Sequence, residues 1–130
     1  MTREETIDRA YEAWTHRDLD VLVALTHPES EARPILGANI GTGVYRGHDG
    51  LRDWMRDLHG EWETFETRVT SVEERGERSL CAIQVRARGR ASGAAIEGEM
   101  YHLLEFRDGL IWRLEAFLDR DAAMQALGAT

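Results

Sequence analysis

The sequence predicts an α+β fold, in which N-terminal helices pack on a curved, mainly antiparallel sheet that encloses a cone-shaped cavity. Two observations support this prediction. Helical patterns come first along the chain, and strand patterns follow them in a run. The last two strand patterns are joined by Asp108-Gly109. Asp-Gly between apolar runs is a strong hairpin signal, because a type I′ turn needs positive φ at both central residues. We therefore expect these two strands to pair antiparallel.

The composition fits one domain, residues 1–130, with a sizeable core. A hydrophobic fraction of 42% and four tryptophans indicate a globular rather than a disordered chain. The net charge of −8 and arginines that do not cluster on a helix face argue against a nucleic-acid partner. The single cysteine, Cys81, allows no internal disulfide, and we find no apolar targeting segment and no stretch of transmembrane length. We therefore expect a cytoplasmic protein without a membrane partner.

Three helices are expected in the first half of the chain. The first covers residues 2–16 and starts with a capping box formed by Thr2 and Glu5. Asp18 caps a second, short helix, and a third helix covers residues 48–59. In all three, apolar residues recur at helical spacing on one face, which we expect to be buried.

The segment between the second and third helices carries two weaker signals. Residues 31–36 are expected to form a short edge strand, because Pro34 cannot donate a hydrogen bond within a sheet. Residues 37–43 contain three glycines but lack the spacing of a phosphate-binding loop. A flexible loop at the rim of a pocket is therefore favoured over a nucleotide site.

Four longer strands and a short terminal helix complete the prediction. The strands are expected over residues 62–74, 79–90, 96–106 and 110–118, and the helix over residues 121–127. Successive side chains point to opposite faces of a strand, which assigns one nearly apolar set to the inner face. The only ionisable residue on the inner face of the last hairpin is His102. The inward set is Cys81, Ile83, Val85, Met100, His102, Leu104, Leu114 and Ala116.

His102 is the first candidate for chemistry, because an imidazole can give or take a proton near neutral pH. The alternative is a buried histidine that is hydrogen-bonded to a neighbour. Tyr45 and Asn39, near the mouth of the cavity, are candidates to hydrogen-bond a carbonyl or hydroxyl group. Asp119 is either a further acid or the cap of the terminal helix. The candidate ligand contacts, for which core packing is the alternative, are Trp14, Trp54, Met100, Leu104, Trp112 and Ala116. The five histidines lack metal-ligand spacing, so we expect neither a metal nor a cofactor.

Several segments resemble a known superfamily. They are residues 45–54 (YRGHDGLRDW), 88–93 (RGRASG), 106–111 (FRDGLI) and 117–120 (FLDR), followed by ALG at 126–128. On these segments the chain resembles, over nearly its whole length, the SnoaL-like branch of the NTF2-like (cystatin-type α+β barrel) superfamily. The resemblance implies the cone fold, and it implies relatives that are polyketide cyclases, ketosteroid isomerases, epoxide hydrolases or dehydratases, besides members without a known reaction.

The resemblance also implies a homodimer joined through the outer face of the sheet. On that face we expect an exposed apolar patch of Tyr101, Leu103 and Phe117, which a second copy would cover.

The positions that carry catalytic groups in this family depart from its pattern here. Counting back from Asp119, the resemblance places Ala116 where cyclases and epoxide hydrolases of the branch have an acid on the last strand. It places Ile83 and Val85 where the epoxide hydrolases have an Arg and an Asp. The resemblance therefore specifies the fold and leaves the chemistry open.

Three functions follow as alternatives. The first is an enzyme that uses cofactor-independent proton-transfer chemistry (cyclisation, isomerisation or hydration) on an apolar, polycyclic or terpenoid-like molecule. The second is a non-catalytic binding protein for a small apolar ligand. The third is a dimerisation module whose cavity is filled by its own side chains. A void beside His102 would favour the first two, and a packed core would favour the third.

Overall fold

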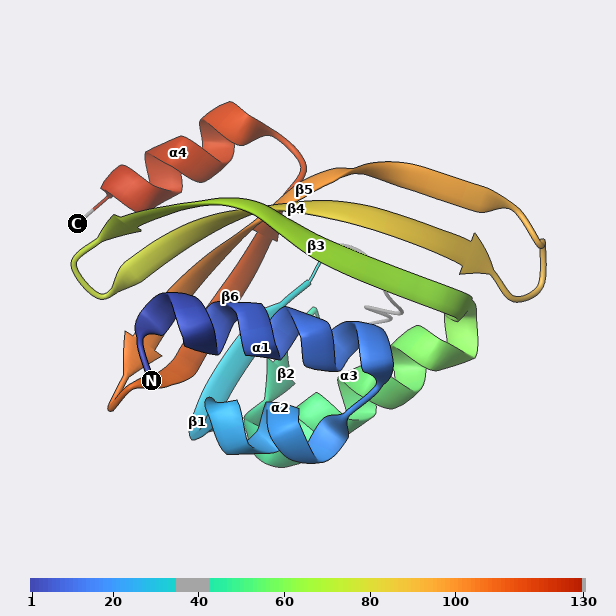
Figure 1. The fold of residues 1–130 in the computed structure, drawn as a ribbon, viewed down its shortest axis with the longest axis horizontal. Coiled ribbons are helices and arrows are strands. Elements are labelled where there is room, and N and C mark those ends of the chain that lie inside the picture. The colour runs from blue at the N-terminus through green and yellow to red at the C-terminus, as the bar shows by residue number, and fades with distance from the viewer. Residues whose placement is uncertain (35–42, 130) are drawn as a thin grey trace.

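The computed structural model describes residues 1–34 and 43–129, in which α1, α2 and α3 lie on the concave side of a curved six-stranded sheet (Figure 1). The strands follow the order β2-β1-β6-β5-β4-β3, so that β2 and β3 form open edges. This arrangement confirms the predicted α+β cone. The elements are α1 (Arg3–His16), α2 (Leu19–Leu25), β1 (Thr26–Arg33), β2 (Tyr45–Arg46), α3 (Gly47–Glu61), β3 (Trp62–Arg75), β4 (Arg78–Gly89), β5 (Ala95–Arg107), β6 (Leu110–Phe117) and α4 (Arg120–Gly128).

Both predicted caps at the start of the chain are present. The backbone N–H of Glu5 donates to the Thr2 hydroxyl at 3.1 Å, and the Glu5 carboxylate accepts from the Thr2 backbone at 2.8 Å. The Asp18 carboxylate caps α2 by accepting from the backbone N–H of Val21. These bonds satisfy N–H groups that have no partner inside a helix. They fix where α1 and α2 begin.

The predicted strand parity is confirmed. In the antiparallel β4–β5 pair, Cys81 lies opposite His102 and Ile83 lies opposite Met100. Ile83 is fully buried, whereas Arg86, three residues further along the same strand, is exposed on the outer face. The predicted hairpin turn is present as well, because Asp108 and Gly109 have φ of 55° and 77°. The inner face is therefore apolar around His102, as the alternation indicates.

The N-terminal part of the sheet differs from the prediction. The first strand covers Thr26–Arg33 and pairs parallel with β6, with an irregularity between residues 26 and 31. Residues 35 and 36 of the predicted strand lie outside the described residues. The two-residue β2 was not predicted at all, because two residues are too few to show a period. Parallel pairing of distant segments likewise leaves no local signal in the sequence.

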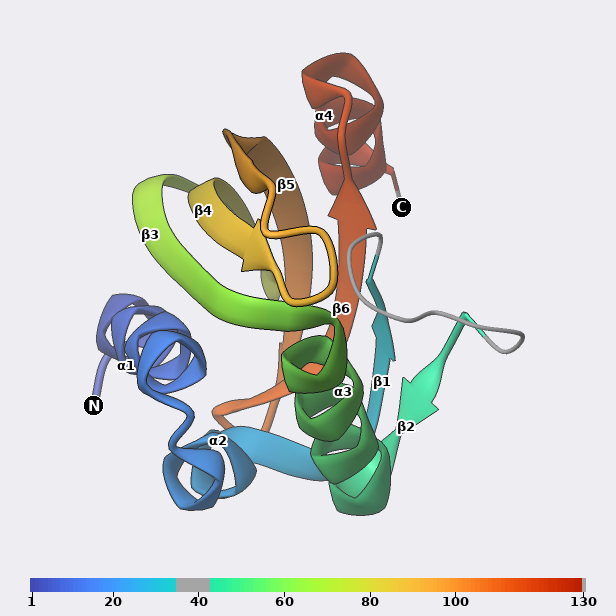
Figure 2. The same ribbon diagram turned by 90° about the vertical axis from the view of Figure 1, so that its right-hand side faces the viewer.

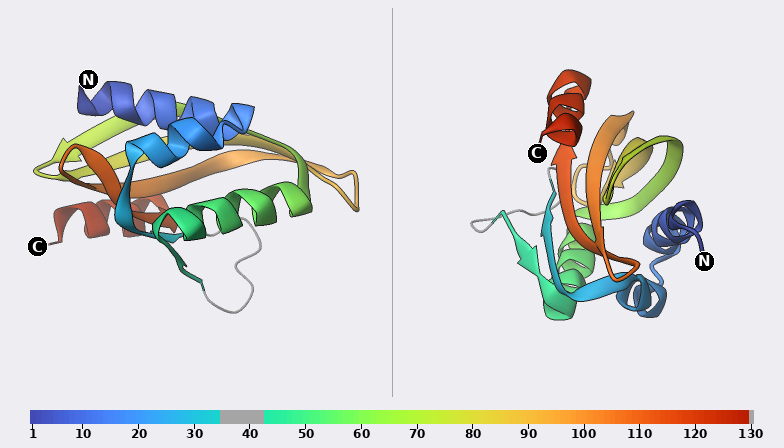
Figure 3. Two further views of the ribbon diagram at one scale, coloured as in Figure 1. Left: turned by 90° about the horizontal axis from the view of Figure 1, so that it is seen from below. Right: turned by 90° about the vertical axis from the view of Figure 1, so that its left-hand side faces the viewer.

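The terminal helix α4 lies on the convex side of the sheet, opposite α1 and α3 (Figure 2, Figure 3). Ala123 and Leu127 of α4 pack there against β4 and β5. The prediction that Tyr101 and Leu103 are exposed is therefore wrong, because α4 buries them to 8% and 7% exposure within one chain. Phe117 is half-buried at the same contact. The homodimer itself stays a prediction, without the exposed patch that motivated it.

Across residues 1–34 and 43–129, none of the helices combines the length and the apolar character that crossing a membrane requires.

Candidate functional site

Two neighbouring cavities lie between the helices and the inner face of the sheet. The larger has about 40 Å³ open to the centre of a water molecule, and the smaller has about 20 Å³. Tyr11, Trp14 and Trp54 line both cavities. The larger cavity also contacts Leu104 and Trp112, and the smaller contacts Met100 and His102. Five of the predicted ligand contacts therefore line a void together with His102: Trp14, Trp54, Met100, Leu104 and Trp112.

His102 is paired with a residue of α1 inside this region. The hydroxyl of Tyr11 lies 2.6 Å from Nδ1 of His102, and both side chains are buried. Burial raises the pKa of Tyr11 well above its usual value, helped by the nearby Cys81 thiol, so the phenol keeps its proton. The phenol O–H has no other acceptor among the described residues, so we assign it as the donor to Nδ1, which places the proton of the neutral imidazole on Nε2.

The imidazole is neutral at physiological pH. Burial lowers the pKa of His102 to about 3, because an imidazolium without a nearby carboxylate is costly inside an apolar core. No described residue accepts a hydrogen bond from Nε2–H. His102 therefore offers one N–H donor at the wall of the smaller cavity, and it is a weak base.

An aromatic cluster borders the two cavities. The ring centroids of Trp14 and Trp54 are 4.4 Å apart, and the Tyr45 ring stacks on Trp54 at 5.9 Å with an interplanar angle of 12°. The indole N–H of Trp54 is buried and has no partner among the described residues. Trp54 comes from the buried stripe of α3, which also contains Leu51 and Leu58.

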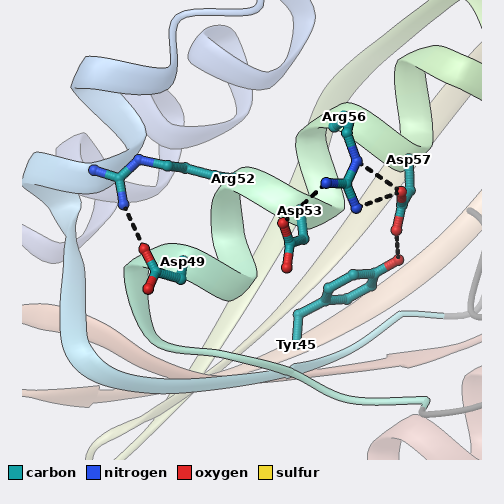
Figure 4. Close-up of polar contacts among 6 residues, drawn as sticks. All are labelled: Tyr45, Asp49, Arg52, Asp53, Arg56 and Asp57. Carbon is teal, nitrogen blue, oxygen red and sulfur yellow. Dashed lines mark hydrogen bonds and ion pairs between the residues drawn. The ribbon is translucent and has the colours of Figure 1, made fainter.

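A polar network on the exposed side of α3 holds Tyr45 in place. Its hydroxyl donates to the Asp57 carboxylate at 2.8 Å, and Arg56 contacts both Asp57 and Asp53 (Figure 4). Burial, followed by the hydrogen bond to Asp57, raises the pKa of Tyr45 to about 12. The predicted role of Tyr45 as a hydrogen-bond partner for a ligand is therefore weakened, because its hydroxyl already binds Asp57. Its ring lines the larger cavity instead.

Two of the predicted site residues that the structure describes, Asp119 and Ala116, contribute no side chain to either cavity. Asp119 is exposed and caps α4 by accepting from the backbone N–H of Ala122 at 3.0 Å, so the cap alternative holds. Ala116 is buried opposite His102 on β6 but lines neither cavity. Asn39 lies outside the described residues.

Sequence reasoning missed Tyr11 and two residues of β1. Tyr11 lies among the buried residues of α1, and its hydroxyl is the available signal, because a buried phenol normally finds a partner. Ser30 and Glu31 line the larger cavity but belong to a strand whose register was not predicted. Glu31 is the one carboxylate among the described lining residues, and it is held by Arg46 at 2.7 Å and Arg33 at 3.5 Å.

A metal site finds no support in the described ranges. Among residues 1–34 and 43–129, no three His, Cys, Asp or Glu side chains converge as ligands for an ion.

Comparisons with known proteins identify the sequence family and the fold. The family model described as SnoaL-like domain matches residues 7–114. A comparison with curated proteins finds no match. An NTF2-like protein of unknown function from Burkholderia pseudomallei has a TM-score of 0.81 at 21% identity, with 99% of this chain and 100% of that chain covered.

Two further structures with the same fold have names that mention a ligand or a reaction. TerC, co-crystallised with polyporic acid, has a TM-score of 0.79 at 19% identity, with 98% of each chain covered. IdmH from Streptomyces antibioticus, a proposed polyketide cyclase, has a TM-score of 0.76 at 20% identity, with 99% of this chain and 100% of that chain covered. At such identities the likeness shows the fold alone.

Proposed function

Because the chain belongs to the SnoaL-like domain family, we propose that its cone cavity binds a small, largely apolar molecule and that His102 donates a hydrogen bond to it. One observation carries this proposal. The imidazole of His102 is held through Nδ1 by Tyr11, while Nε2–H has no acceptor among the described residues and the side chain borders a void.

An unpaired N–H inside an apolar region is unfavourable. A donor without a partner in such a place costs up to about 1–3 kcal/mol, and a ligand oxygen placed at Nε2 would supply the partner. The remaining walls are largely apolar and aromatic, and they include Met100, Trp14 and Trp54. Such walls stabilise an apolar ligand, while a single donor fixes its orientation.

The preferred ligand is uncharged on this account. No Lys or Arg appears among the described residues that line the cavities, and the neutral imidazole supplies no positive charge. The one lining carboxylate, Glu31, is already paired with two arginines. Burying a ligand carboxylate or ammonium without an opposite charge would be costly. A ketone, ester, lactone or ether oxygen meets the requirement without that cost.

Cofactor-independent proton transfer is the second candidate function, and the Tyr11–His102 pair favours it. A neutral imidazole is a good donor to an oxygen that gains negative charge in a transition state. With a pKa near 3 it is a poor general base, and Asp119 caps α4 instead of lining either cavity. Cyclisation, isomerisation or hydration would therefore need a base other than His102. For this reason we place binding first and catalysis second.

Titration with cyclohexanone tests the proposal. This one-ring ketone is compared with cyclohexylamine and cyclohexanecarboxylate, which carry opposite charges on the same ring. We expect cyclohexanone alone to bind, and we expect His102→Leu to weaken it about tenfold, because one hydrogen bond is lost. His16→Leu is the matched control, since His16 is exposed on α1 and lines neither cavity. Equal affinities for the wild type and His102→Leu would contradict the proposal.

A further inference from the structure

We infer that Thr67 on β3 is a positioning residue for the candidate site: it holds the turn of α1 that carries Tyr11, and through Tyr11 it fixes the hydrogen bonding of His102. This inference rests on the proposed function, because it names the residue that positions the donor of the same site. Thr67 lines the smaller cavity together with Tyr11 and His102, so the three side chains border the same space.

Thr67 belongs to an open edge of the sheet, and α1 runs beside that edge (Figure 1). Its backbone N–H donates to the hydroxyl of Thr15 on α1 at 3.0 Å. The Thr15 hydroxyl in turn lies 3.3 Å from the Thr67 carbonyl oxygen and 3.2 Å from the Thr67 hydroxyl, and it donates to one of them. The N–H and C=O of one strand residue point to the same side of the strand. The backbone of Thr67 therefore faces α1, and a single side chain joins the helix to the free edge.

The hydroxyl of Thr67 makes the contact with Tyr11. It donates to the backbone carbonyl of Tyr11 at 3.1 Å. Tyr11 and Thr15 are four residues apart, so they lie one turn apart on the same face of α1. Thr67 thus holds both ends of a single helical turn. The same turn carries the phenol that lies 2.6 Å from Nδ1 of His102.

Apolar packing of α1 does not by itself place the phenol accurately. The buried apolar residues of α1 hold the helix against the sheet, but the hydrophobic effect is non-directional. The bond between Tyr11 and His102 is directional, and it weakens steeply when the donor is displaced or tilted. The hydrogen bonds at Thr67 are directional as well, so they fix the position of this turn along and around the helix axis. A functional side chain held in this way by its neighbours keeps the geometry that its contact needs.

Three variants isolate the hydroxyl of Thr67. Thr67→Val removes the hydroxyl at nearly constant side-chain size, and Thr67→Ser keeps it. Both leave the backbone N–H that donates to Thr15 in place. Thr70→Val is the matched control, because Thr70 lies on the same strand and its hydroxyl donates to the carbonyl of Ala82 on β4. Thr70 lines neither cavity.

Nitrogen-15 NMR of His102 at pH 7 tests the inference without a ligand. In Thr67→Val we expect the shifts of the two ring nitrogens to move toward each other, because a displaced phenol no longer selects one tautomer. Thr67→Ser and Thr70→Val should keep the wild-type shifts. Loss of packing alone would lower the free energy of unfolding without changing the tautomer. Cyclohexanone should bind about three- to tenfold more weakly to Thr67→Val than to the other proteins.

The outcomes separate this inference from the proposed function. If folded Thr67→Val keeps the wild-type shifts, or if Thr70→Val changes them equally, Thr67 does not position Tyr11, and binding at His102 stands. If Thr67→Ser does not restore the wild-type shifts, the hydroxyl is not the cause, and the inference fails. If cyclohexanone does not bind even to the wild type, the proposed function fails, and the nitrogen shifts still decide the role of Thr67. Thr15→Val takes the place of Thr67→Val if circular dichroism shows that Thr67→Val is unfolded.

Discussion

The hydroxyl of Tyr11 is hydrogen-bonded to Nδ1 of His102 across 2.6 Å, although the two residues lie 91 positions apart in the chain. The bond connects α1 to the middle of β5 through the core. It also decides the chemistry of the imidazole, because with the phenol as the donor to Nδ1 the proton of the neutral imidazole lies on Nε2. One contact therefore serves the fold and the candidate site together.

Tyr11→Phe should destabilise the protein by about 1–3 kcal/mol, because it leaves Nδ1 of His102 buried without a donor. Urea denaturation at pH 7 measures the change. In the background of His102→Leu the same substitution should cost much less, since the group that needs the donor is gone. Equal costs in the two backgrounds would show that the hydrogen bond contributes nothing to stability.

The free energy of unfolding should depend on pH through the titration of His102. Its pKa is about 3 in the folded protein against the ordinary 6.5, so between these values the unfolded chain binds a proton that the folded chain does not. The contribution of His102 to the free energy of unfolding is therefore fully present above pH 6.5 and is lost as the pH falls toward 3. Between pH 7 and pH 5 the wild type should lose about 2 kcal/mol more than His102→Leu. Parallel stability curves for the two proteins would contradict the buried neutral imidazole.

Cys81 should be unreactive in the folded protein. Its side chain is fully buried, and burial raises the pKa of its thiol to about 12, so the reactive thiolate is scarce at neutral pH. We expect a thiol reagent such as N-ethylmaleimide to modify Cys81 at pH 7.5 only when the chain unfolds. Modification in native buffer at the rate seen in urea would contradict this placement.

Asp57→Asn should lower the pKa of Tyr45 from about 12 part of the way toward its usual value. Burial is the largest cause of the shift and remains, while the hydrogen bond to a charged carboxylate and its repulsion of the phenolate are lost. An ultraviolet titration of tyrosinate, with Tyr45→Phe to assign the signal, measures the change. Asp49→Asn is the control, since Asp49 lies on the same helix and contacts Arg52 instead (Figure 4). An equal shift in both variants would show that the contact with Asp57 is not the cause.

Much of the fold could be predicted from the sequence, because it follows from patterns among residues that are close together in the chain. Alternation on β4 and β5 placed Ile83 and His102 inward, and Asp108-Gly109 marked the hairpin turn. These signals depend only on neighbours in the chain. The same local rules identified Asp119 as a possible cap, which the structure confirms.

The rest depends on contacts between distant segments. Nothing near Tyr11 in the sequence shows that its hydroxyl meets His102, and nothing near Tyr101 shows that α4 folds back over it. The parallel pairing of β1 with β6 brings Ser30 and Glu31 to the cavity for the same reason. The sequence therefore predicted which face carries the site, but not the partner that sets the protonation of His102.

Nitrogen-15 NMR of the histidine side chains tests the central claim most directly, because it reports the proton on each ring nitrogen of His102. We predict that His102 remains neutral with its proton on Nε2 from pH 7 down to pH 5. We also predict that cyclohexanone shifts the Nε2–H resonance while that of His16 stays unchanged. A His102 ring that is protonated at pH 5, or an Nε2–H resonance that cyclohexanone leaves in place, would contradict the account.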